Sequence, residues 1–182
     1  MRAAGHATRE RILAAAKAEF ARYGVAGARI NRIAEAAHAS KDRLYAYFGG
    51  KDDLYAAVTE QWATETTAET ALDADDLPSY VGRLFDHYLR HPDNARLQSW
   101  AEIERTDIPA AEAAIRRAVA PKLAEIRRGQ RAGAITDTFQ PLTLLTLLTD
   151  LARTSAVHAL HGDDVGDRRD ATVRAARRVI AP

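Results

Sequence analysis

The chain of 182 residues contains no cysteine, a single methionine and few aromatic residues. The absence of cysteine excludes disulfides, thiolate metal sites and cysteine nucleophiles, and it fits a reducing compartment. The N-terminal residues lack the apolar run of a secretory signal. The longest apolar stretch, residues 142–160, is interrupted by Asp150 and Arg153 and falls short of a membrane span. These absences favour a soluble, cytoplasmic protein with no membrane partner.

The net charge is only +1, but its distribution along the chain is uneven. Residues 1–51 contain 10 lysines and arginines and 4 acidic residues, whereas residues 52–182 contain 16 and 21. A basic N-terminal segment before an acidic remainder is expected when one domain binds phosphates and the other does not. A chance fluctuation in charge remains the alternative interpretation.

Apolar residues recur at helical spacing along the whole chain, and no window alternates as a strand does. The pattern predicts an all-α fold of about nine helices, with 47% hydrophobic residues to form its core. Thr8 is a predicted N-cap and Gly24 a predicted end of the first helix, and Ser40 is the predicted N-cap of the third. The predicted division is a reading domain at 1–51 and a larger helical domain at 52–182.

Residues 30–51, INRIAEAAHASKDRLYAYFGGK, have the pattern of a helix-turn-helix. Leu44 and Phe48 of the third predicted helix are predicted to face inward, which leaves the polar and basic side chains of that helix facing outward. Lysine and arginine bridge the two acceptors of guanine, and tyrosine and lysine suit phosphates. Asp42 is placed to accept from a cytosine amine or to orient Arg43. The alternative is a three-helix bundle with a basic surface and no role on DNA.

Residues 8–62 resemble the N-terminal domain of the TetR family of bacterial transcriptional regulators. The matching pieces are TRERILAAAKAEFARYG, RIAEAA and SKDRLYAYFGGKDDLY. The resemblance implies a repressor whose homodimer binds a palindromic double-stranded DNA operator and is released by a small molecule. With the residues that begin the reading helix included, the predicted DNA-binding set is Asn31, Arg32, Ser40, Lys41, Asp42, Arg43, Tyr45, Tyr47 and Lys51.

Four departures from the family pattern fall in the helix-turn-helix. His38 stands where the turn usually has glycine, and histidine tolerates a positive φ better than most residues. Ala39 replaces a larger aliphatic residue. Asp42 and Arg43 replace glycine and a small residue, which is expected to change base preference. Ala28 and Arg29 stand where the second helix usually has a Ser/Thr cap, so one phosphate contact is expected to be missing.

In the family, the C-terminal domain binds a ligand among its middle helices and dimerises through its last two helices. The segment from Leu142 to Leu160 is apolar on nearly all sides, so a partner subunit is an economical source of cover; a monomer that covers both faces itself is the alternative. Aromatic and polar residues of the middle helices are candidate effector contacts, although aromatics at helical spacing are often only core. The predicted effector set is Trp62, Tyr80, Phe85, Tyr88, Trp100, Thr146, Thr149 and His158.

Other classes of function are weighed against this prediction. No nucleotide-binding, nucleophile-elbow or zinc-protease motif is present, so no enzyme activity, cofactor or resident metal is predicted. A metal-sensing regulator is one alternative, because His87 and His91, with Asp86 adjacent, and His158 and His161 are paired at helical spacing. A helical protein-binding module without specific DNA binding is the other.

Overall fold

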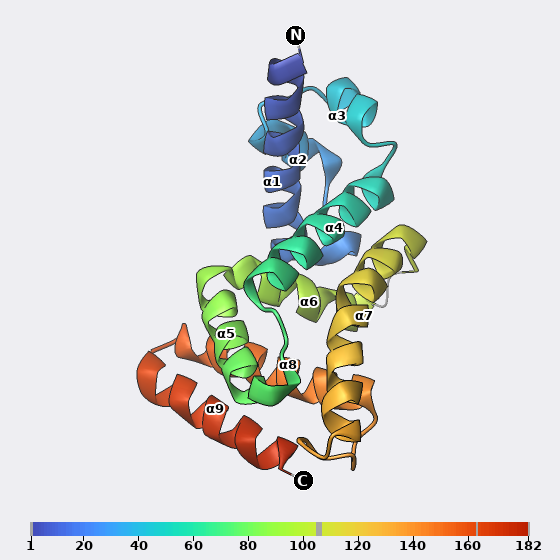
Figure 1. The fold of residues 1–182 in the computed structure, drawn as a ribbon. Coiled ribbons are helices and arrows are strands. Elements are labelled where there is room, and N and C mark those ends of the chain that lie inside the picture. The colour runs from blue at the N-terminus through green and yellow to red at the C-terminus, as the bar shows by residue number, and fades with distance from the viewer. Residues whose placement is uncertain (1, 105–106, 163, 182) are drawn as a thin grey trace. The chain divides into compact units, whose positions relative to one another are not determined.

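The computed structural model describes residues 2–104, 107–162 and 164–181, with side chains from residue 5 onward. Within these ranges the chain is helical and contains no strand, as predicted. Figure 1 labels the helices. They are α1 (Arg2–Gly27), α2 (Ile30–Ala36), α3 (Lys41–Tyr47), α4 (Lys51–Glu69), the short 3-10 helix η1 (Ala74–Asp76), α5 (Leu77–Arg90), α6 (Pro92–Glu104), α7 (Pro109–Arg131), α8 (Pro141–Ala159) and α9 (Val165–Ile180).

The boundaries of the first helix correct one prediction and confirm another. Thr8 is not an N-cap, because α1 already begins at Arg2 and the Thr8 side chain is buried inside it. Gly24 interrupts the regular helix, since its φ of 68° produces a kink before the last turn. Only glycine adopts this conformation without strain.

The chain packs as two compact units, each made from two stretches of sequence. The first contains residues 1–63 and 93–115, and the second contains residues 64–92 and 116–182. Thus α4 contributes to both units, and α6 joins the unit of the helix-turn-helix. None of the helices in the described ranges is long and apolar enough to cross a membrane.

The first unit is organised around α1, whose apolar face covers α2, α3 and the start of α4. The largest fully buried side chains here are Ile12, Phe20, Ile33, Leu44 and Leu54. Their burial in one shared core fixes the two seven-residue helices α2 and α3 against α1 and α4, because α2 and α3 are too short to be stable alone.

The kink in α1 is held by α6. The Glu104 carboxylate accepts hydrogen bonds from the backbone N–H groups of Val25 (2.7 Å) and Ala26 (3.2 Å). The Trp100 indole N–H donates to the carbonyl of Ala21 at 3.2 Å. A Cβ at Gly24 would overlap the Glu104 carboxylate and lie 2.9 Å from Trp100 Cε3. Gly24 is therefore needed both for its backbone conformation and for the close approach of α6.

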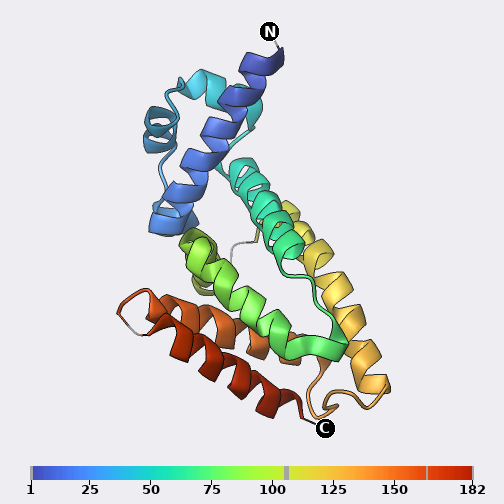
Figure 2. The same cartoon turned by 60° about the vertical axis from the view of Figure 1, so that its left-hand side comes forward.

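In the second unit, α5 packs against both α8 and α9. Figures 1 and 2 show α8 and α9 side by side. Tyr80, Phe85 and Tyr88 of α5 are buried. The Arg169 guanidinium of α9 binds both Asp86 carboxylate oxygens, at 2.8 and 2.9 Å. The bidentate pair fixes the register of α9 along α5.

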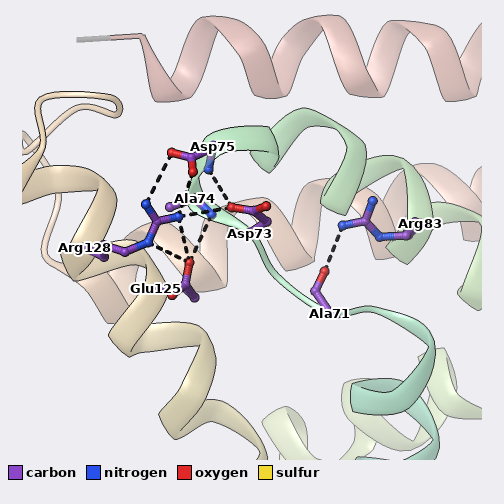
Figure 3. Close-up of polar contacts among 7 residues, drawn as sticks. All are labelled: Ala71, Asp73, Ala74, Asp75, Arg83, Glu125 and Arg128. Atoms are coloured by element: carbon purple, nitrogen blue, oxygen red, sulfur yellow. Dashed lines mark hydrogen bonds and ion pairs between the residues drawn. The ribbon is translucent and has the colours of Figure 1, made fainter.

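A polar network fastens the segment between α4 and α5 to α7 (Figure 3). The Arg128 guanidinium of α7 donates to Asp73, Asp75 and Glu125, and Glu125 in turn accepts from the backbone N–H of Ala74. The group is partly exposed, so its effect on stability is modest for each pair. Its geometric effect is to fix the path of the chain where it enters α5.

Candidate functional site

The helix-turn-helix consists of α2, a short turn and α3, whose N-terminus is capped. His38, in the turn after α2, has a φ of 50°, as predicted for the residue that replaces glycine. The Ser40 hydroxyl accepts from the backbone N–H of Arg43 at 3.2 Å and so caps α3. Leu44 and Phe48 are buried in the core of the first unit. The inward face of α3 is thereby fixed, which leaves its other face to solvent.

The solvent-facing residues of α3 are the predicted base and phosphate contacts. Lys41, Asp42 and Arg43 are exposed in the first turn, and Tyr45 is 49% exposed one turn later. Asn31 is exposed on α2. An exposed helix face with two basic groups and a tyrosine has the residue types needed to contact the major groove and its flanking phosphates.

Three other predicted DNA contacts make interactions within the first unit. The Arg32 guanidinium donates to Glu19 (2.7 Å) and to the Gly27 carbonyl (3.0 Å), and it lies over the Tyr23 ring. Its hydrogen bond to Glu19 raises the pKa of Arg32. The Lys51 amine donates to the Val25 carbonyl at 2.7 Å.

Tyr47, the third of these residues, is half-buried against the core. Arg32, Tyr47 and Lys51 therefore have structural roles that their sequence pattern did not reveal.

The start of α2 lacks a side-chain cap at Arg29, as predicted. A carboxylate from α1 partly replaces it, because Glu19 accepts from the Arg29 backbone N–H at 2.9 Å. At the other end of α2, the Arg11 guanidinium donates to the Ala37 carbonyl at 3.2 Å. These two α1 residues position the turn, and sequence reasoning did not single them out. Arg11 and Glu19 are eight residues apart, which places them on the same face of α1; this spacing is the signal from which their shared role could have been predicted.

The predicted effector residues are distributed over both units. Trp62 and Trp100 belong to the first unit, and Trp100 is engaged with α1. The other six belong to the second unit. Tyr80, Phe85 and Tyr88 are buried, Thr149 is partly buried, and Thr146 and His158 are exposed on α8. The structure brings Tyr80 and Thr149 together through a side-chain hydrogen bond.

A lysine joins this pair. The Lys122 amine of α7 lies 3.4 Å from the Tyr80 hydroxyl and 3.3 Å from the Thr70 hydroxyl, and it contacts the Tyr80 ring. Burial lowers the pKa of Lys122 to about 8 and raises that of Tyr80. In the described parts of the chain, no carboxylate pairs with this amine. A largely buried cation without a counter-ion is costly, and it marks this position as a candidate functional site.

Sequence reasoning missed Lys122, although a signal was present. The residue lies three positions after Val119 and four before Ile126, on the apolar stripe of α7. A charged residue at such a position is either buried or reaches past its neighbours to solvent.

A second polar cluster lies at the end of α4. His87 Nδ1 is 2.9 Å from the Glu69 carboxylate, and His91 Nε2 is 3.3 Å from its other oxygen. Arg90 also binds Glu69 at 2.8 Å. The hydrogen bond from His87, aided by Arg90, lowers the pKa of Glu69 to about 2. Burial lowers the pKa of His87, with Glu69 acting in the opposite direction.

This cluster corrects the composition of one predicted histidine group. Asp86, named with His87 and His91 from the sequence, does not join them because it binds Arg169. Glu69 of α4 takes its place. In the other predicted pair, His158 is exposed and His161 Nδ1 bonds the Val157 carbonyl at 2.8 Å.

Comparison with known proteins identifies both parts of the chain. A family model for bacterial regulatory proteins of the tetR family matches residues 12–58, and one for the tetracyclin repressor-like C-terminal domain matches residues 76–181. The HTH-type transcriptional repressor SCO4008 of Streptomyces coelicolor is 39% identical over 184 residues, which cover 96% of this chain and 95% of that protein.

Solved structures agree with these matches. The structure of SCO4942, assigned as a transcriptional regulator of Streptomyces coelicolor, superposes with a TM-score of 0.79 and 41% identity, over 95% of this chain and 98% of that one. A TetR-family regulator from Marinobacter aquaeolei VT8 gives a TM-score of 0.80 with 21% identity, over 100% and 99% of the two chains, and supports the fold.

Proposed function

Because the chain belongs to the TetR family of DNA-binding transcriptional regulators, we propose that it is a repressor whose homodimer binds a palindromic operator and is released by a small molecule. The observation that carries the DNA-binding part is the exposed face of α3. Lys41, Arg43 and Tyr45 project from a helix whose other face is fixed by Leu44 and Phe48. Such a helix enters the major groove as a rigid reader.

The proposed contacts divide by chemistry. Arg43 is assigned to a base edge, because its planar guanidinium bridges the two acceptors of guanine. Lys41 and Tyr45 are assigned to phosphates, as is Asn31 of α2. Arg32, Tyr47 and Lys51 remain proposed contacts, and each has to reach DNA from a side chain that already braces the first unit.

A homodimer is proposed through α8 and α9. Leu142 and Leu147 of α8 are 58% and 44% exposed, Leu160 directly after α8 is 48% exposed, and Val165 at the start of α9 is 44% exposed. A partner subunit would remove this apolar surface from water, and its two-fold axis would set two reading helices at a fixed spacing.

The proposed effector carries an acidic group. Lys122 lacks a counter-ion among the described residues, and the Tyr80 hydroxyl beside it, which also bonds Thr149, can hydrogen-bond a bound molecule. A carboxylate on the effector would supply the missing charge, and the buried aromatic residues Phe85 and Tyr88 of the same helix as Tyr80 are the proposed contacts for its apolar part. The proposed functional division places DNA reading in residues 1–51 and effector binding and dimerisation in residues 52–182.

Selection of bound duplexes from a random DNA pool at near-physiological salt tests the DNA-binding proposal. A palindrome with two half-sites is the expected result, and sedimentation of the protein with that duplex should give two chains per site. Arg43→Ala should lose affinity at one base position of each half-site. Arg127→Ala, an exposed arginine on α7, is the matched control and should bind normally. Recovery of unrelated sequences, or of none, would overturn the proposal.

The effector proposal is tested with the same duplex. Small carboxylic acids and their matching primary amides are screened for release of the DNA. Acids should act where amides do not, and Lys122→Gln should abolish the response while binding DNA as the unaltered chain does. Equal responses to acids and amides would contradict the assigned chemistry.

A further inference from the structure

Three metal-ligating side chains from two helices converge in the second unit. Glu69 is the last residue of α4, and His87 and His91 lie one turn apart on α5. One ligand atom from each of the three lies within 4.8 Å of the others. The carboxylate stands between the two rings, with one oxygen 2.9 Å from His87 Nδ1 and the other 3.3 Å from His91 Nε2.

The three ligand atoms lie somewhat farther apart than a bound zinc ion would hold them. A tetrahedral zinc ion with ligand bonds of about 2.0 to 2.1 Å holds neighbouring ligand atoms about 3.3 Å apart. His87 Nδ1 and His91 Nε2 approach different oxygens of Glu69, at 2.9 and 3.3 Å, whereas ligand atoms taken one from each residue lie within 4.8 Å of one another. The planes of the two imidazole rings make an angle of 43°, and their centroids are 4.8 Å apart. Rotation of the partly exposed Glu69 and His91 side chains toward His87 would bring the three ligand atoms around one ion.

The buried histidine is held in a fixed orientation by its other ring nitrogen. His87 Nε2 lies 3.1 Å from the Thr66 hydroxyl of α4, and the ring is completely buried. Metal-binding histidines commonly use the second nitrogen in this way, which directs the first toward the ion. Glu69 and His91 are each about one-third exposed, so an ion can enter from solvent and keep water at its fourth position.

Arg90 is the group that opposes an ion here. Its guanidinium binds the same Glu69 oxygen that faces His87, at 2.8 Å. The arginine side chain is 56% exposed, so it can leave Glu69 and extend into solvent when a cation arrives. Without metal, Arg90 neutralises the carboxylate; with metal, it would be displaced. Removal of Arg90 should therefore favour the ion.

We propose that Glu69, His87 and His91 form a binding site for a divalent transition-metal ion of the zinc type, which joins the last turn of α4 to α5. The site does not depend on the operator, the effector or the dimer. Failure of either proposal thus leaves the other standing.

The test uses the full-length protein, freed of metal with a chelator, and titrates it with Zn²⁺ by calorimetry and with Co²⁺ by visible absorption. One ion per chain and the intense visible bands of tetrahedral Co²⁺ are expected. His91→Gln and Glu69→Gln are partly exposed positions that should leave the fold intact, as circular dichroism will verify. Each substitution should weaken zinc binding by more than about a hundredfold, because loss of a residue that only supports a metal ligand costs less than this.

Two further variants sharpen the result. The double variant His158→Gln/His161→Gln removes the exposed histidines of the α8 end and should bind zinc unchanged. Arg90→Gln should bind zinc more tightly, by about tenfold for an interaction of about 1.4 kcal/mol. Absence of stoichiometric binding, a site lost in the His158/His161 variant, or unaltered binding by His91→Gln would overturn the proposal.

Discussion

Replacing Lys122 with methionine is expected to stabilise this protein at neutral pH. The amine is largely buried beside the Thr70 and Tyr80 hydroxyls, and burial lowers its pKa from 10.5 to about 8. At 1.36 kcal/mol per pKa unit, this difference corresponds to a cost of about 3 kcal/mol for keeping the folded lysine charged. Methionine has a similar length and adapts its shape, so most of that cost should be recovered.

The neighbouring hydroxyls keep partners in the variant. Thr70 donates to the Thr66 carbonyl, and Tyr80 shares a hydrogen bond with Thr149. We therefore expect a net gain of about 1 to 3 kcal/mol, the lower value applying if the methionine packs imperfectly.

The pH dependence gives an independent signature of the same effect. Below pH 8 the lysine is protonated in both states, and the full cost is present. Between pH 8 and 10.5 the unfolded chain binds more protons than the folded one, so the stability of the unaltered protein rises with pH. Burial raises the pKa of Tyr80 from 10.0, so the unfolded tyrosine titrates before the folded one and opposes the rise near the upper end of this window; the measurement is therefore made at pH 9.5. In the Lys122→Met variant, the part of the pH-dependent increase in stability that comes from Lys122 should be absent.

Urea unfolding followed by circular dichroism at pH 7.0 and at pH 9.5 measures both quantities, at one fixed chain concentration because association contributes to stability. Lys41→Met, an exposed lysine on α3, is the matched control and should change stability by less than about 0.5 kcal/mol. The reasoning is refuted if Lys122→Met is no more stable than the unaltered chain at pH 7.0 and both gain equally at pH 9.5.

Three further substitutions probe the reading head and the exposed face of α8. Gly24→Ala should destabilise the protein by about 2 to 3 kcal/mol in urea unfolding, because the positive φ is strained for alanine and the new methyl group displaces the Glu104 carboxylate; a loss below 0.5 kcal/mol would contradict this. Ser40→Ala should cost about 1 kcal/mol and weaken DNA binding, since it removes the cap of α3; Ser40→Asp should restore the stability, and failure to do so would argue against a capping role. Leu147→Glu should yield monomers in sedimentation equilibrium, as a charge replaces a 44% exposed leucine on the proposed interface, whereas Arg127→Glu on α7 should not; an unchanged dimer in the first variant would place the interface elsewhere.

The helices were predictable because their signals are local. The Ser40 cap and the apolar pair Leu44 and Phe48 lie within nine residues of each other, and a helix needs no distant partner to define its face. The positive φ of His38 followed from its place in a short turn. The same locality explains the error at Thr8, where a good capping residue lies inside a helix that begins earlier.

The pairings between distant segments could not be predicted in this way. Glu69 meets His87 across 18 residues, and Lys122 meets Thr70 across 52. Lys122 is a charged residue on an otherwise apolar stripe, which marks it as unusual but does not indicate what it contacts. The choice of Glu69 over Asp86 as the partner of the two histidines depends on how α4 and α9 pack against α5, which no periodicity encodes.

The clamp of α6 on the Gly24 kink has a consequence for anyone who builds chimeric regulators from this protein. A graft that takes only the first 58 residues would leave behind Glu104 and Trp100, so the N–H groups of Val25 and Ala26 would lose their acceptor. The turn that sets the start of α2 would then be loosened in the transplant. A transferable head has to carry residues 93–104 with it, on the same chain or as an added peptide.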